Sequence, residues 1–332
     1  MFGTRRLGGS QVSEASKNFC ESLGIEHPII CGAMYPCSNV ELVAAASEAG
    51  GIGVVQPLTL TYVNGLDFRE GLRQIKALTS KPIGMNALIE GSSKIYMDRM
   101  AKYVDIALDE GVRFFVTALG NPSWVVEKVH ERGGTVFHDV TDLNWAEKAL
   151  KANVDGFICV NNRAGGHAGH LTKEMLFERL TKLGKPLICA GGLSTKDDIQ
   201  KALDVGFAGV QLGTRFIATQ ECNADLAYKN AIVAAKEGDV VLSEKITGVP
   251  VSVINTPSVQ KLGLKANPLE KLLLQHRKTK HWMRMFYSLK SFHSLKKSIN
   301  APSPYKDIWQ AGKSVEGIDS IKSVKEVFDE LT

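Results

Sequence analysis

Short, almost wholly apolar runs alternate with longer segments in which apolar residues recur at helical spacing. Each apolar run has the length of a strand, and each longer segment carries its charges on the opposite face. Strands that are apolar on both faces and alternate with helices are typical of a parallel sheet covered by helices. Eight runs are predicted to be strands: 28–33, 51–56, 82–88, 113–118, 135–139, 154–160, 186–190 and 209–212.

The connecting segments complete a repeating β–α pattern. Eight such units predict a closed (β/α)₈ barrel, also called a TIM barrel. An open, doubly wound sheet is the alternative, but no G-x-G-x-x-G motif opens the first helix, and the glycines suited to a phosphate come late in the chain. The helices are expected over 39–49, 68–79, 94–110, 123–132, 143–152, 173–183 and 195–205.

The last third of the chain departs from this alternation. Residues 221–300 have a mostly helical pattern, broken at Pro250, Pro257 and Pro268. We interpret them as a smaller helical second domain, inserted after the barrel of residues 1–220. Residues 301–332 then return to the barrel, with a helix from about 321 to 331.

Composition adds little to the choice of fold, but it argues against a membrane protein, a disulfide-rich protein and a metalloprotein. A hydrophobic fraction of 44%, a charged fraction of 23% and a net charge of +5 are ordinary for a soluble globular protein. No apolar run follows Met1, and no stretch approaches the roughly 20 apolar residues of a membrane span. The six cysteines form no C-x-x-C pair, so we expect reduced core thiols in a cytoplasmic protein and no metal site.

One segment concentrates positive charge. Residues 261–297 contain ten Lys or Arg and one acid, Glu270, interleaved with apolar side chains. A solvated helical face over a small core is the favoured interpretation. An anionic partner or substrate is the alternative, while nucleic acid and a membrane surface are disfavoured.

The candidate chemistry lies where the predicted strands end. In a (β/α)₈ barrel all carboxyl ends of the strands meet at one mouth, where active sites form. The sixth strand is followed by Gly165, Gly166 and His167. Glycines allow close approach of the backbone, and a histidine beside them can exchange a proton near neutral pH.

The seventh and eighth strands also end in glycine. Gly191 and Gly192 follow Ala190, and Gly213 and Thr214 follow the eighth strand. Backbone N–H groups in these two loops can point at phosphate oxygens, and this is the usual phosphate site of the architecture. The sequence therefore predicts a phosphate-bearing ligand at the mouth.

Taken together, these motifs resemble the nitronate monooxygenase (2-nitropropane dioxygenase) family over most of the chain. FMN-dependent enoyl-acyl carrier protein reductases and some NADH:quinone reductases share the pattern. The Gly-Gly-His form is nearer to the monooxygenases and enoyl reductases than to the quinone reductases. The matching motifs are His27–Ile30, Gly32–Met34, Pro82–Asn86, Ala164–His167, Ala190–Gly192 and Gly213–Phe216.

The resemblance implies one bound FMN and assigns residues to it. Ala33 and Met34 would meet the flavin ring, and Asn86 would bond near it. Gly165 and Gly166 would lie along the cofactor, and His167 matches the catalytic histidine. The phosphate would be held by Ala190, Gly191, Gly192, Gly213 and Thr214.

The resemblance also implies the reaction: oxidation of alkyl nitronates by O₂ to a carbonyl compound and nitrite. Partners would be the small nitronate and O₂, with a homodimer as a further expectation. Enoyl-thioester reduction, quinone reduction and a non-enzymatic flavin-binding module stay open as alternatives.

The chain departs from the pattern at one position. Asp139 follows His138 where several members carry a lysine, so an acid replaces a cation near the expected flavin. Near the other end, Tyr305 and Lys313 are candidates to reach the mouth.

Overall fold

A closed barrel of eight parallel strands forms the centre of the computed structural model, which describes residues 13–91, 93–246, 249–265 and 307–332. Each strand pairs with its neighbours in chain order, and β1 closes the barrel against β8 through pairs such as Ile30 with Gln211. The predicted barrel and all eight strands are confirmed. The strands are β1 Ile29–Cys31, β2 Ile52–Val55, β3 Ile83–Ile89, β4 Phe114–Leu119, β5 Thr135–Val140, β6 Gly156–Val160, β7 Leu187–Ala190 and β8 Gly209–Leu212.

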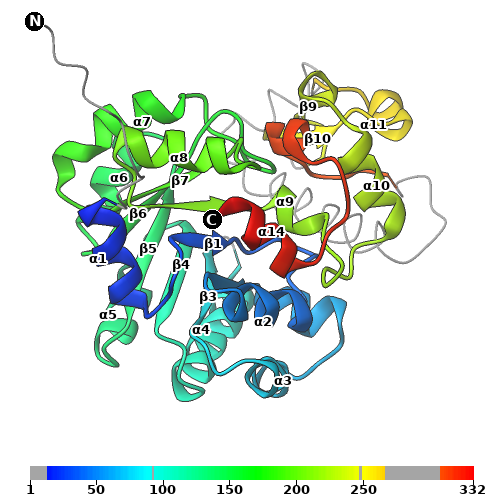
Figure 1. Cartoon of the computed structure of the whole chain (residues 1–332). Helices are drawn as coiled ribbons and strands as arrows, with labels where there is room; N and C mark the ends of the chain where they lie inside the picture. The colour runs from blue at the N-terminus through cyan, green and yellow to red at the C-terminus, as the bar shows by residue number, and fades with distance from the viewer. Residues whose placement is uncertain (1–12, 92, 247–248, 266–306) are drawn as a thin grey trace, which may run out of the picture.

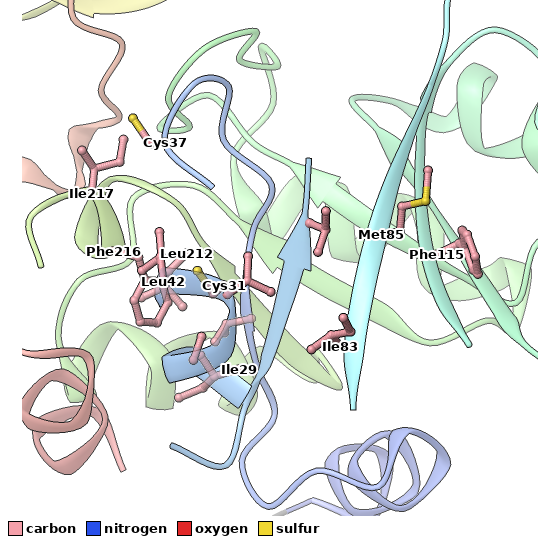
Figure 2. Packing of buried hydrophobic residues seen from close by; sticks show 14 of the residues in the cluster. Ile29, Cys31, Cys37, Leu42, Ile83, Met85, Phe115, Leu212, Phe216 and Ile217 are labelled. Carbon is pink, nitrogen blue, oxygen red and sulfur yellow. The ribbon is translucent and has the colours of Figure 1, made fainter. Parts of the chain in front are cut away.

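Helices cover the outside of the barrel in the order in which the chain makes them (Figure 1). Alternate strand residues point outward and pack on these helices: Figure 2 shows Ile29 and Cys31 of β1 beside Leu42 and Phe216. The predicted connectors are therefore confirmed. They are α2 Val40–Glu48, α3 Phe68–Leu78, α4 Lys94–Asp109, α5 Ser123–His130, α6 Leu143–Leu150, α7 Lys173–Leu180 and α8 Lys196–Val205, with the short η1 Thr59–Val63, η2 Thr181–Leu183 and α9 Thr214–Ile217 between them.

One end of the barrel is closed by a helix that the sequence analysis did not predict. The helix α1 (Glu14–Leu23) brings Phe19 into the cluster inside the barrel, where its ring lies 5.8 Å from that of Phe137. Phe137 in turn packs edge-on against Phe114 at 5.5 Å. The amino-terminal end of the barrel is therefore filled with apolar side chains.

A smaller unit follows the barrel and stands to one side of it (Figure 1). It contains α10 Leu226–Ala234, η3 Glu237–Asp239, β9 Val240–Ser243, β10 Val251–Ile254 and α11 Pro257–Leu262. The strands β9 and β10 form an antiparallel pair, so the expectation of a helical domain was incomplete. Val251 and Val253 of β10 are fully buried, and apolar runs that short do not distinguish strand from helix.

The end of the chain packs on the helices of the barrel. The turn η4 (Lys313–Gly317) precedes the final helix α14 (Val324–Leu331), which packs on α2 and α8. The Phe328 ring of α14 stacks near Phe216, with ring centres 5.7 Å apart.

Two further expectations can be checked in the described part of the chain. No helix there is both long and apolar enough to cross a membrane. The six cysteines are buried and form no disulfide, which confirms the prediction of core thiols.

Most of the basic segment 261–297 and Tyr305 lie outside the described residues. The expectations made for them therefore stay predictions.

Candidate active site at the open end of the barrel

The Gly165–His167 loop leaves β6 at the carboxyl end of the barrel and meets the smaller unit there. Gly166 has a φ of +65°, a conformation that favours glycine. Its carbonyl accepts a hydrogen bond of 2.8 Å from the amide of Ser252 in β10. The smaller unit therefore fixes the backbone next to His167.

The carboxyl-terminal segment covers the other side of this loop. A Cβ atom on Gly165 would lie 2.8 Å from the amide nitrogen of Gly312, so only glycine allows the two backbones to approach. The amide of Gly312 donates to Thr214 Oγ1 at 2.9 Å. Gly165 thus has a structural reason to be glycine, whatever ligand the mouth holds, and the Thr214 hydroxyl is already engaged.

His167 projects from this loop into solvent. Its side chain is exposed, and among the described residues neither ring nitrogen has a hydrogen-bond partner. The surrounding protein nevertheless desolvates the ring and lowers the pKa of His167 below its ordinary value. The imidazole is therefore neutral at physiological pH and has a lone pair available to take a proton.

The two loops after β7 and β8 leave backbone donors unused. Gly191 and Gly192 have φ values of +114° and +71°. Within the described residues, no acceptor is hydrogen-bonded to the amides of Gly191, Gly192, Gly213 or Thr214. Buried or half-buried N–H groups are almost always paired in proteins, so these four are suited to an anion.

The glycines of the two loops differ in what surrounds them. A Cβ on Gly191 would lie 2.5 Å from Asn161 Oδ1, and one on Gly192 would lie 2.6 Å from Arg163 Nε. A Cβ on Gly213 would meet nothing closer than Met34 Sδ, at 3.5 Å. Gly213 is therefore the one of the three whose missing side chain leaves space beside its amide.

The remaining predicted residues also lie at this end of the barrel. Half-buried Ala33 packs against the inner cluster, to which buried Ala190 belongs. A side chain on Gly84 would point at Phe114 and Val54 inside the barrel. Asn86, two residues further along the strand, therefore points into the barrel as well. Its Nδ2 donates to the carbonyl of Val116 at 3.3 Å.

The two residues at the end of β5 point in opposite directions. Buried His138 faces outward, and its Nδ1 lies 2.8 Å from Thr117 Oγ1. Burial lowers the pKa of His138 to about 4, so its ring is neutral. Asp139 lies on the inner face, and its Oδ1 is inaccessible to solvent and has no hydrogen-bond partner among the described residues.

An ion cluster beside the glycine loop was not found from the sequence. Arg163 forms a two-bonded pair with Glu237 of η3, at 2.8 and 2.7 Å. Lys313 Nζ lies 3.2 Å from Glu237 Oε1. Lys313 therefore comes close to the loop, as expected, but its charge is directed to Glu237. In the sequence, the glycine before Lys313, Gly312, is the feature that could have indicated a turn here and so the contact of Lys313 with Glu237.

A separate groove lies outside the barrel, between α5 and α6. It has a volume of about 440 Å³ and is lined by residues that include His138, Trp145 and Lys148. None of the predicted site residues lines it. The groups capable of binding and catalysis lie instead at the mouth, which combines unpaired amides, a neutral imidazole and an inward-pointing carboxyl.

Comparisons with known proteins identify one family, and the similar proteins carry different names. A family model described as nitronate monooxygenase matches residues 16–332. A probable nitronate monooxygenase from Staphylococcus saprophyticus is 25% identical over 283 residues, covering 72% of this chain and 79% of that protein. The structure of FabK from Thermotoga maritima aligns with a TM-score of 0.76 and 26% identity, over 95% of this chain and 94% of that one.

A higher identity is found with a different enzyme. A (3aS,4S,5R,7aS)-5-hydroxy-7a-methyl-1-oxo-octahydro-1H-indene-4-carboxyl-CoA dehydrogenase from Mycobacterium tuberculosis is 30% identical over 246 residues. The match covers 73% of this chain and 67% of that protein. The chain thus spans about two thirds of the length of the dehydrogenases that it matches.

Proposed function

Since the chain belongs to the nitronate monooxygenase family and is an oxidoreductase, we propose that it binds FMN at the open end of its barrel and oxidises alkyl nitronates with O₂. Each O₂ would serve two nitronates: in each one the C=N bond is replaced by C=O, with one oxygen atom from O₂, and the nitrogen leaves as nitrite. The observation that carries this proposal is a neutral imidazole, His167, at the same mouth as four unpaired amides.

The unpaired amides fit the phosphate of FMN. Gly191, Gly192, Gly213 and Thr214 present N–H groups from adjacent loops, and Gly213 leaves room for an oxygen beside them. One phosphate needs one such cradle, which suits a mononucleotide. Ala33, Met34, Asn86 and the Gly165–Gly166 backbone would then border the flavin, with Ala190 beside the phosphate.

FMN, when bound, would supply the electron-accepting chemistry. The protein would supply proton transfer and orientation. A neutral nitroalkane carries an acidic C–H next to its nitro group, and a ring nitrogen of His167 would take that proton to give the nitronate. Protonated His167 would then face the nitronate oxygens as a cation.

A second candidate is oxidation or reduction of an acyl-CoA or related thioester. It is favoured by the 30% identity to the Mycobacterium tuberculosis carboxyl-CoA dehydrogenase, which exceeds the 25% identity to the probable nitronate monooxygenase from Staphylococcus saprophyticus. A C–H next to a thioester carbonyl is also acidic, so His167 could act on it as it would on a nitroalkane.

Kinetics on the purified, FMN-loaded protein separate the two candidates. The proposal expects O₂ uptake with a short alkyl nitronate in the absence of any nicotinamide cofactor, with nitrite formed. Rapid anaerobic bleaching of the flavin by NADH, NADPH or a cyclic carboxyl-CoA, with no nitronate-dependent O₂ uptake, would replace it with the thioester reaction.

A further inference from the structure

Asp139 is a carboxyl group at the mouth that neither candidate reaction uses. It lies two residues beyond Phe137, whose ring belongs to the cluster inside the barrel, so both side chains share the inner face of β5. Asp139 as a whole is half-buried, so it reaches the open end, while its Oδ1 is inaccessible and unpaired. A buried polar atom without a partner calls for an explanation, and a ligand is one.

Among the described residues, no nearby charge offsets the burial of this carboxyl. Its neighbours on the adjacent strands are apolar: Ile158 on β6 and the last residues of β4. The polar side chains of Asn86 and Gln211 on the inner face carry no charge. Burial alone raises the pKa of Asp139 to about 7. Without a cation, an ionised carboxylate here is unfavourable, and the neutral acid is the form that the site stabilises.

The titratable groups around Asp139 are neutral as well. Cys159 on β6 interacts with it electrostatically, and burial raises the thiol's pKa far above its ordinary value. His138, on the opposite face of β5, and His167, in the loop after β6, both have lowered pKa values. Among the described groups at this end whose pKa is shifted, Asp139 is therefore the one whose protonation state changes near neutral pH.

We propose that Asp139 is a ring-binding residue: in its neutral form it donates a hydrogen bond to an acceptor on the FMN ring. The inference rests on the proposed cofactor. It adds the protonation state of Asp139 in which the protein binds the ring. The ring of FMN offers carbonyl oxygens and unprotonated nitrogens as acceptors. An ionised Asp139 could only accept, from the ring N–H, which would give the opposite dependence on pH.

The test is the dissociation constant of FMN from the apoprotein between pH 6 and pH 9, followed by quenching of flavin fluorescence. Native protein should lose affinity on the order of tenfold per pH unit above about 7, because ionised Asp139 can no longer donate. Asp139→Asn keeps the shape and an N–H donor at every pH, so its affinity should stay nearly level. Asp139→Ala should bind more weakly at pH 6 and also lack the slope.

Two comparisons remove other sources of pH dependence. Riboflavin has the ring without the phosphate, so the native slope should persist with it if Asp139 reads the ring. His167→Ala should retain the slope, since the histidine is not its origin.

The outcomes separate this inference from the proposed function. Native protein that binds FMN equally at all pH values, binds it more tightly as pH rises, or shows the same slope as Asp139→Asn would overturn the role of Asp139 alone. Failure of the native protein to bind FMN at any pH would overturn the proposed cofactor and this inference with it.

Discussion

The two ends of the barrel interior are built by the same eight strands and have opposite chemistry. At the closed end, Phe19, Phe114 and Phe137 pack ring against ring beneath α1. At the open end, Asp139 has an unpaired oxygen, His167 has no partner among the described residues, and the loops after β7 and β8 offer unused amides. The strand β5 contributes to both, with Phe137 and Asp139 roughly 7 Å apart along it.

The contrast shows which end of the barrel carries polar groups that lower the stability of the fold. Polar groups at the closed end would be costly, and the described side chains that pack in the inner cluster there are apolar. Unpaired groups gather at the open end, where a ligand could pair with them, which is typical of a functional site. The predictions below test whether each end has the role that this contrast assigns to it.

The largest expected effect is on proton transfer at the open end. His167→Ala should keep its flavin and lose about 10²–10⁴-fold in turnover of neutral nitroalkane, since a positioned base contributes about that much. Turnover of preformed nitronate should fall less, because no proton remains to be taken. Initial rates of O₂ uptake measure both.

His170→Ala is the matched control for this variant, because His170 is another exposed histidine in the same loop. Its rates should stay close to native. Equal losses of His167→Ala on nitroalkane and nitronate would refute the role of base and favour an electrostatic one.

At the closed end the expected effect is on folding. Phe137→Ala removes a ring that packs on Phe19 and Phe114, and should lower the free energy of unfolding by about 3–5 kcal/mol. Urea denaturation measures it. Where the variant is folded, its affinity for FMN should be near native. A stable variant that has lost FMN would show that the two ends are not separate in role.

Asp139 should destabilise the empty fold in a pH-dependent way. Its folded pKa is raised from 3.8 to about 7, so the folded chain holds a proton that the unfolded chain releases between those values. Stability should therefore fall as pH rises through this window. Asp139→Asn removes the ionisation and should be more stable than native apoprotein at pH 8, by on the order of 2 kcal/mol.

Denaturation of the apoprotein at pH 5 and pH 8 measures this difference. The gain should shrink at the lower pH, where native Asp139 is already neutral. An Asp139→Asn variant that is less stable than native protein at pH 8 would indicate that the carboxylate is stabilised by a contact absent from this account.

The smallest effect is expected in the basic segment 261–297, most of which lies outside the described residues. Reversing the charge at Lys278, Lys280 and Arg284, in the basic segment, should leave O₂ uptake with small nitronates within a few-fold of native if the segment is a solvated face. If it docks an acidic carrier, activity on carrier-bound acyl chains should collapse and should weaken further with salt, since exposed charges are screened over about 10 Å at 0.1 M.

The barrel could be predicted from the sequence because its strands are apolar on both faces and its helices are amphipathic. The helix α1 was not predicted, since its role depends on Phe19 meeting Phe137 across the barrel. The same holds for β9 and β10, whose burial is tertiary, and for the Arg163–Glu237 pair, whose partners lie 74 residues apart.

The candidate site was predictable in position but not in its contacts. Glycines and His167 at strand ends mark the mouth because the architecture brings those ends together. Tertiary packing decides that Gly165 meets Gly312 and that Asp139 has no partner among the described residues. The spacing of residues in the sequence does not indicate either contact.

The most direct test of the account is the FMN content of Gly213→Val. A side chain at Gly213 is in ordinary contact with Met34, so the variant should fold, yet it would fill the space beside the unpaired amides. Native protein should hold one FMN per chain after reconstitution, and the folded variant, verified by circular dichroism, should hold almost none. Normal FMN content in the folded variant, or native protein that cannot be loaded with FMN, would contradict the claim that the open end holds the cofactor through these loops.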